Sequence, residues 1–172
     1  MKSGLLGEAA SPVDADVIYD TPFESGAITY ARVEGLAPLV DATHAHVLDR
    51  LGPGVRAVSF TADGDDALGA LGRVIADRYG LAAPRRAVAH RNYMFGYHSD
   101  VTNPYPCINA TMFFRHDCAG GALIFPELRI GVAAHDGWVA IFDGQILHGV
   151  TMLEPWNRDA YRVSLCYYCP TP

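Results

Sequence analysis

Hydrophobic and polar positions follow two different patterns along the chain. Up to about residue 86, two segments carry apolar residues at helical spacing, and each is preceded by a short alternating run. We expect strands at 27–33 and 55–60, and a first helix over 36–51 that stops at Gly52-Pro53. A second helix, capped by Asp63 or Asp65, is expected to end near Gly80.

From residue 87 the apolar runs are short and are separated by turn residues such as Gly120-Gly121, Asp136-Gly137 and Asp143-Gly144. This spacing predicts seven strands, at 87–97, 107–114, 122–125, 130–134, 138–142, 146–152 and 161–168. Many short strands at regular spacing indicate an antiparallel barrel or sandwich, closed or of jelly-roll type. With helices packed on one outer sheet, the fold class is α+β.

The length of 172 residues favours a single domain. We expect residues 1–26 to be a partly ordered lead-in, 27–86 a helical and strand support, and 87–169 the β core. Half of the residues are hydrophobic and 19% are charged, which excludes a disordered chain.

The net charge of −6 comes entirely from residues 1–80, since residues 81–172 carry seven basic and seven acidic side chains. This balance weighs against tight, sequence-independent binding to DNA. A local basic groove is still compatible with it, with these candidate members: Arg85, Arg86, His90, Arg91 and Arg115. No apolar run is long enough to span a membrane, and the first residues do not look like a secretory signal, so we expect a cytoplasmic protein with no membrane contact.

Four cysteines are present, at positions 107, 118, 166 and 169. Cys166 and Cys169 form a C-x-x-C pair that could be half of a zinc site, but the other two lack matching spacing. We favour buried thiols that act as small hydrophobic side chains.

His98-Ser99-Asp100 is the first element of a candidate metal site, expected at the end of the 87–97 strand. On an extended chain alternate side chains share a face, so His98 and Asp100 can reach one ion. A surface turn with an Asx hydrogen bond is the alternative for so short a motif. His148, on a later strand, can complete a set of two imidazoles and one carboxylate, which leaves three positions open on iron(II).

Arg162 and Ser164 lie on one face of the last strand, 14 residues after His148. Burying an arginine in an apolar strand is costly without a partner, and that strand contains no acid. A bound dicarboxylate would supply the partner. Gly120-Gly121, between the two parts of the metal motif, permits a close backbone approach.

Residues 88–168 together resemble the iron(II)- and 2-oxoglutarate-dependent dioxygenases, whose fold is a double-stranded β-helix. The motif series is most similar to the TET/JBP-like branch, which oxidises the methyl group of 5-methylcytosine or thymine in nucleic acid. It comprises His98-Ser99-Asp100-Val101-Thr102-Asn103, Asn109, Gly120-Gly121-Ala122-Leu123, Leu147-His148 and Arg162-Val163-Ser164. The chain differs from large members of that branch in lacking basic or zinc-binding extensions.

The resemblance implies that His98, Asp100 and His148 bind Fe(II), and that these ligands carry the catalysis. It further implies that 2-oxoglutarate places its distal carboxylate on Arg162, assisted by Ser164. Further candidates for cosubstrate contacts or for supporting the metal ligands are Asn92, Tyr93 and Asn109. With O2 as the second cosubstrate, decarboxylation of 2-oxoglutarate to succinate would drive hydroxylation of an unactivated C–H bond.

Two substrate classes follow from these observations. The leading one is a modified pyrimidine base in DNA, attacked at its 5-methyl group, for which Tyr97, Tyr105 and Phe114 are candidate walls. The other is a free small-molecule metabolite, which suits the short, acidic chain. A non-catalytic β-barrel that binds a ligand is the non-enzymatic alternative.

Overall fold

A computed structural model describes residues 8–101 and 106–171 of the chain. Its helices, in chain order, are the 3-10 turn η1 (Pro12–Asp14), α1 (Ala37–Arg50) and α2 (Ala67–Arg78). Its strands are β1 (Val17–Tyr19), β2 (Phe23–Glu24), β3 (Ile28–Arg32), β4 (Ala57–Thr61), β5 (Arg86–Arg91), β6 (Cys107–His116), β7 (Cys118–Gly120), β8 (Leu123–Phe125), β9 (Ile130–Val132), β10 (Trp138–Asp143), β11 (Gly149–Val150), β12 (Leu153–Pro155) and β13 (Tyr161–Pro170).

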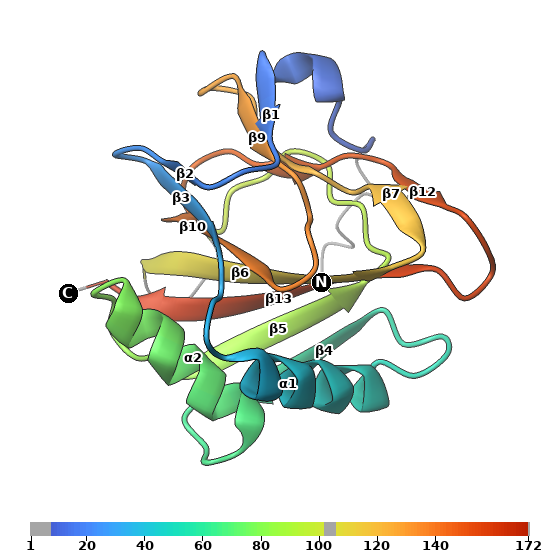
Figure 1. Ribbon diagram of the computed structural model, residues 1–172. Helices are drawn as coiled ribbons and strands as arrows, with labels where there is room; N and C mark the ends of the chain where they lie inside the picture. The colour runs from blue at the N-terminus through green and yellow to red at the C-terminus, as the bar shows by residue number, and fades with distance from the viewer. Residues whose placement is uncertain (1–7, 102–105, 172) are drawn as a thin grey trace.

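The strands form a larger and a smaller sheet, with a separate β7–β12 ribbon at one side (Figure 1). The larger sheet has seven strands in the order β2-β3-β10-β6-β13-β5-β4, and the smaller has four in the order β1-β9-β8-β11. Strands distant in sequence therefore lie side by side, as β13 lies between β5 and β6. The predicted α+β class with a double-stranded β-helix, or jelly-roll, core is confirmed.

Helices α1 and α2 cover the outer face of the larger sheet, as the sequence predicted (Figure 1). Their buried apolar residues, among them Val47, Leu68 and Ile75, pack in one cluster with residues of β6 and β13. Burial of this face is what holds the helices in place, because isolated helices of this length are marginal in water. None of the described helices is long and apolar enough to cross a membrane.

A second core fills the space between the two sheets. It contains Tyr30 of β3, Phe125 of β8 and Phe142 of β10. The adjacent residues Phe113 and Phe114 of β6 belong to different cores, Phe113 between the sheets and Phe114 under the helices. This is the period-2 alternation of a strand with both faces covered.

Five local features differ from the sequence prediction, one of which is the unpredicted ribbon of β7 and β12. The strand predicted over 87–97 ends at Arg91, because Asn92 has a left-handed backbone with φ 51° and turns the chain out of the sheet. The strand predicted over 146–152 is reduced to Gly149–Val150. Part of the predicted lead-in supplies β1 and β2, which pair with β9 and β3. The cap of α2 is Asp66, not Asp63 or Asp65.

The Asp66 cap provides a test of the fold. Its carboxylate accepts a hydrogen bond from the Gly69 amide at 2.8 Å, satisfying one of the free donors of the first helical turn. We expect Asp66→Ala to lower the free energy of unfolding by about 1 kcal/mol, measured by urea denaturation. The neighbouring Asp65→Ala is the control, because Asp65 is fully exposed and its 3.6 Å ion pair with Arg73 is a surface pair. Equal losses in the two variants would contradict the capping role.

Candidate metal centre and ligand pocket

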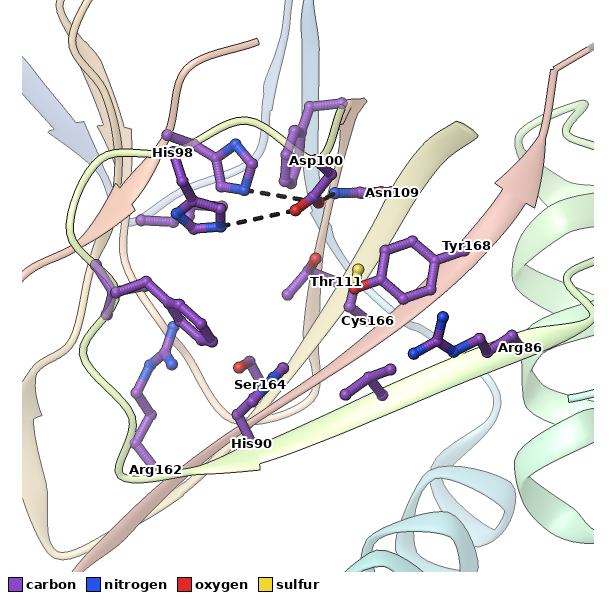
Figure 2. A pocket seen from close by; sticks show the side chains of 16 residues that line it. Arg86, His90, His98, Asp100, Asn109, Thr111, Arg162, Ser164, Cys166 and Tyr168 are labelled. Atoms are coloured by element: carbon purple, nitrogen blue, oxygen red, sulfur yellow. Dashed lines mark hydrogen bonds and ion pairs between the residues drawn. The ribbon is translucent and has the colours of Figure 1, made fainter. Parts of the chain in front are cut away.

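A pocket of about 290 Å³ opens between the two sheets (Figure 2). Alternate residues of three neighbouring strands of the larger sheet form its floor. The opposite wall is formed by the loop that follows β5, by His148 before β11 and by Val150 at its end. The lining residues are Arg86, Val88, His90, Phe95, His98, Asp100, Asn109, Thr111, Leu123, Phe142, His148, Val150, Arg162, Ser164, Cys166 and Tyr168.

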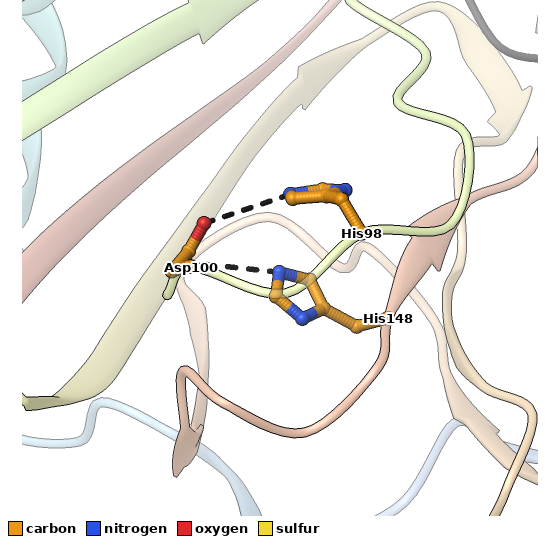
Figure 3. Close-up of side chains that lie close together, drawn as sticks. All are labelled: His98, Asp100 and His148. Atoms are coloured by element: carbon orange, nitrogen blue, oxygen red, sulfur yellow. Dashed lines mark ion pairs between the residues drawn. The ribbon is translucent and has the colours of Figure 1, made fainter. Parts of the chain in front are cut away.

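His98, Asp100 and His148 converge in this pocket (Figure 3). One ligand atom from each lies within 4.8 Å of the other two. The His98 Nε2 atom is 3.7 Å from Asp100 Oδ1, and the His148 Nε2 atom is 3.9 Å from Asp100 Oδ2. These are the only three His, Cys, Asp or Glu side chains in the described ranges that form such a group.

Backbone hydrogen bonds, and not a regular strand, bring the three residues together. His98 and His148 form an antiparallel bridge in which each amide donates to the carbonyl of the other residue at 2.9 Å. The Asp100 amide donates to the Gly144 carbonyl at 2.7 Å. The motif was predicted at the end of a strand, but it lies in the loop after β5, and the Asp143-Gly144 turn anchors it.

Both imidazoles are oriented to present Nε2 to a shared point. The Nδ1 atom of His98 lies 2.8 Å from the Gly96 carbonyl, and that of His148 lies 2.7 Å from the Ile146 carbonyl. Since a carbonyl only accepts, Nδ1 carries the proton and Nε2 keeps its lone pair. Burial lowers the pKa of His148, which also favours the neutral form that a metal ion requires.

Asn109 holds the Asp100 carboxylate in place. Its side-chain amide donates to Asp100 Oδ2 at 2.6 Å, and the residue is buried on β6. Groups that support a ligating carboxylate in this way fix its orientation. Asn109 was predicted from the sequence as a candidate for cosubstrate contacts or for supporting the metal ligands, and in the structure it contacts Asp100.

Arg162 is the most unusual side chain of the pocket. It is 2% exposed, and its Nε and Nη1 atoms have no hydrogen-bond partner. No described carboxylate lies within ion-pair distance of it, and its nearest aromatic contact is the Phe113 ring, 5.3 Å from Cζ. Burial lowers the pKa of Arg162 to about 10, so the side chain still carries its charge at neutral pH.

Two neighbours fix the position of Arg162. A Cβ at Gly121 would lie 2.6 Å from Arg162 Cδ, so only a glycine leaves room for the side chain at this point. Gly121 also has φ +67°, a conformation that favours glycine. On the other side, Asn92 Oδ1 accepts from the Arg162 amide, and the Asn92 amide donates to the Arg162 carbonyl, both at 2.8 Å.

Solved structures with similar folds share one class of protein. A 2OG-Fe(II) oxygenase family member from Burkholderia pseudomallei has a TM-score of 0.60 at 17% identity, covering 91% of this chain and 96% of that one. A Pseudomonas putida prolyl-4-hydroxylase has a TM-score of 0.61 at 16% identity, with coverages of 85% and 93%. NgTET1 in complex with 5mC DNA has a TM-score of 0.57 at 12% identity, with coverages of 90% and 81%. No family model matches the sequence, and no curated protein sequence matches it.

This chain has the fold of the 2-oxoglutarate/Fe(II) oxygenases. The likeness includes a TET protein, in line with the resemblance read from the sequence motifs. The pocket, with the converging side chains of His98, Asp100 and His148, lies between the two sheets of this fold.

The other residues predicted for the oxygenase site are distributed differently. Ser164 lines the pocket beside Arg162. Asn92 does not line it and instead binds the Arg162 backbone. Tyr93 does not line it either, and packs its ring against His90 and Phe95.

The predicted basic groove does not form as a unit. Of its five members, Arg86 and His90 line the pocket, whereas Arg91 projects to the opposite face of β5 and donates to the Leu51 carbonyl. Arg85 lines a separate depression with Asp63 and Arg73. Arg115 lies outside the pocket.

Three further pocket residues, Thr111, Cys166 and Tyr168, were not predicted from the sequence. The signal was available, because Arg162 and Ser164 were predicted to face the ligand and the same period of two brings Cys166 and Tyr168 to that face. Cys166 and Cys169 consequently point to opposite sides of β13, with Cys169 in the core under the helices. All four cysteines are buried, as expected for thiols that act as small hydrophobic side chains.

The metal ligands can be tested by binding of Mn(II), followed through the electron paramagnetic resonance of the free ion. Asn109→Ala removes a support of the Asp100 carboxylate and should weaken binding by about 10- to 100-fold. Asp100→Asn removes a ligand and should weaken it further. Asp143→Asn is the control, because this exposed acid lies in the adjoining turn and outside the pocket. Equal affinity in the Asp100→Asn and Asp143→Asn proteins would contradict the proposed ligand set.

Proposed function

We propose that this protein is an Fe(II)- and 2-oxoglutarate-dependent dioxygenase that hydroxylates a C–H bond. The observation that carries the proposal is a buried arginine without an acidic partner in the same pocket as two imidazoles and a carboxylate. A binding module would have no need for both features. Together they match the two ends of a keto diacid held on a metal ion.

The residues present fit Fe(II). His98 and His148 would ligate through Nε2 and Asp100 through one carboxylate oxygen, a set that leaves three positions open. Bound iron with 2-oxoglutarate and O2 supplies the strong oxidant that an unactivated C–H bond requires. The protein's contribution is to fix the three ligands, through the His98–His148 bridge and the Asn109 amide.

The residues also fit the distal carboxylate of 2-oxoglutarate. The free Nε and Nη1 donors of Arg162 can satisfy its oxygens, and the Ser164 hydroxyl lies on the same strand face. His90 is opposite Ser164 in the pairing of β5 with β13. Burial, and secondarily Arg162, lowers the pKa of His90 to about 4, so that it is a neutral hydrogen-bonding group beside the cosubstrate.

An apolar wall shields the reacting centre. Leu123, Phe142 and Val150 of the second core line the pocket beside the metal ligands. Excluding water there protects a reactive centre from side reactions and strengthens the electrostatic contacts within the site.

For the substrate we favour a small molecule over a base in DNA. A volume of about 290 Å³ is at the lower end for ligand pockets, and it has to hold the cosubstrate as well. Of the predicted walls for a flipped base, Phe114 faces the helices and Tyr97 bonds to Asp14 outside the pocket, while Tyr105 lies outside the described residues, as do Thr102 and Asn103. The 5-methyl group of a modified pyrimidine is the second candidate, supported by the fold likeness to NgTET1, whose structure contains 5mC DNA.

The reaction class is tested by anaerobic titration of the protein with Fe(II) and 2-oxoglutarate. A dioxygenase should develop a visible charge-transfer band and, once O2 is admitted, should release succinate. Product mass spectrometry with methylated DNA and with a metabolite panel then separates the two substrate classes. Absence of the band in the wild-type protein would favour the non-catalytic ligand-binding module.

Arg162→Met tests the cosubstrate site. We expect the Kd for 2-oxoglutarate to rise by about 10- to 150-fold, as for loss of a charge-assisted hydrogen bond, with Mn(II) affinity unchanged. Accordingly, 2-oxoglutarate should raise the Tm of the wild-type protein but not that of the variant. Arg115→Met is the matched control. Arg115 of β6 is the pairing partner of Arg162 in the ladder of β6 and β13, but it lies outside the pocket. A parallel loss of metal affinity in Arg162→Met would count against the assigned role.

A further inference from the structure

We propose that the substrate is a small carboxylic acid whose carboxylate binds Arg86 and Tyr168 at the end of the pocket opposite Arg162. This inference rests on the proposed dioxygenase function and specifies its substrate class. It would make Arg86 a specificity-determining residue.

The pocket has a cation at each end. Arg162 and Tyr168 are six residues apart on β13, which corresponds to about 20 Å between their Cα atoms. Arg86 pairs directly with Tyr168 in the ladder of β5 and β13, so it too lies at the far end. Figure 2 shows Arg86 and Tyr168 together, well away from Arg162, with the metal ligands across the pocket from both.

Arg86 is free to bind an anion. It has no ion pair with any described acidic side chain, and its one aromatic contact is with Tyr168, whose ring centre is 5.8 Å from the guanidinium carbon. The side chain is exposed at the mouth of the pocket, whereas Arg162 is enclosed. Arg162 is therefore suited to a ligand that is enclosed by the protein, and Arg86 to one that is reached from the mouth of the pocket.

The charges of the loaded pocket also call for an anion at this end. The two charges of Fe(II) and that of Arg162 balance Asp100 and the two carboxylates of 2-oxoglutarate. Among the lining arginine and acidic side chains, this leaves Arg86 as the one without a counter-charge, which a monocarboxylate supplies.

The surface between Arg86 and the metal ligands is short and polar. Thr111, Cys166 and Tyr168 all line the pocket between its two ends. The Cys166 thiol donates to the Tyr167 carbonyl at 3.9 Å. Burial raises the pKa of Cys166, so its thiol stays neutral beside an anion. A small acid anchored at Arg86 can extend along these groups and present a C–H bond to the metal, with the Tyr168 hydroxyl as a second donor to its carboxylate.

The experiment uses a panel of small monocarboxylic acids, amino acids included, each paired with its primary amide. Wild-type protein loaded with Fe(II) and 2-oxoglutarate is assayed for succinate release and for a product 16 mass units heavier, the mass of one oxygen atom. Further arms contain sugar phosphates and an oligonucleotide with 5-methylcytosine. We expect stimulation by at least one acid, with at least tenfold weaker stimulation by its amide.

The variants identify the residue responsible. For a stimulating acid, Arg86→Met should raise KM by at least tenfold, and Arg86→Lys should recover part of that loss. The Kd for 2-oxoglutarate and the anaerobic charge-transfer band should stay at wild-type values in both. Arg85→Met is the matched control, since the neighbouring arginine lies in a different depression, and it should leave KM unchanged. Tyr168→Phe should raise KM by a smaller factor than Arg86→Met.

The outcomes separate this inference from the function on which it rests. If the wild-type protein gives neither the band nor succinate, the dioxygenase proposal fails and this one fails with it. If the band forms but amides serve as well as acids, only the phosphates or the oligonucleotide stimulate, or no acid stimulates, then only the carboxylate proposal is overturned. An unchanged KM in Arg86→Met overturns it as well.

Discussion

The burial of Arg162 without an acidic partner is the constraint on which the site depends. Enclosing an uncompensated guanidinium in protein is unfavourable by several kcal/mol, roughly, unless an anion joins it. The protein nevertheless accommodates this side chain. Gly121 leaves room for its Cδ atom, and Asn92 forms hydrogen bonds with both the amide and the carbonyl of Arg162. Such a side chain is expected to reduce the stability of the free protein and to recover that loss when a carboxylate binds. Ligand binding and fold stability are thus coupled at one residue.

Pattern and spacing predicted the elements that carry the site, because they depend on local sequence. The period of two along 161–168 correctly placed Arg162 and Ser164 on one face, and the two helices on one outer sheet followed from their apolar stripes. The motif order from His98 to Arg162 was sufficient to indicate the double-stranded β-helix. The helices and the face of the last strand are fixed by residues close together in the sequence, whereas the motif order indicated the fold through its resemblance to a known family.

The parts that could not be predicted depend on contacts between distant residues. Nothing in the local sequence indicates that Asn92 turns the chain out of β5 to meet Arg162, 70 residues later. Periodicity likewise cannot show that His98 and His148 pair through their backbones, since a single bridge gives no repeating pattern. The role of Arg86 was obscured for the same reason. The sequence grouped Arg86 with four other basic residues in a predicted groove. Only the pairing of β5 with β13 shows that Arg86 faces the pocket, whereas Arg85 and Arg91 do not.

The two arginines of the pocket also illustrate how burial divides roles between identical side chains. An enclosed guanidinium has few water molecules to exchange, so its interaction with an anion is strong and its position tolerates little variation. An exposed guanidinium at the mouth exchanges its partner for water with little penalty, so it can select among ligands without holding any of them permanently. The metal ligands lie across the pocket from both, so a molecule anchored at the mouth and one anchored at the enclosed end can reach the same ion. In the proposed reaction the same diacid would bind at Arg162 in every cycle, whereas the position at Arg86 would determine which substrate is accepted.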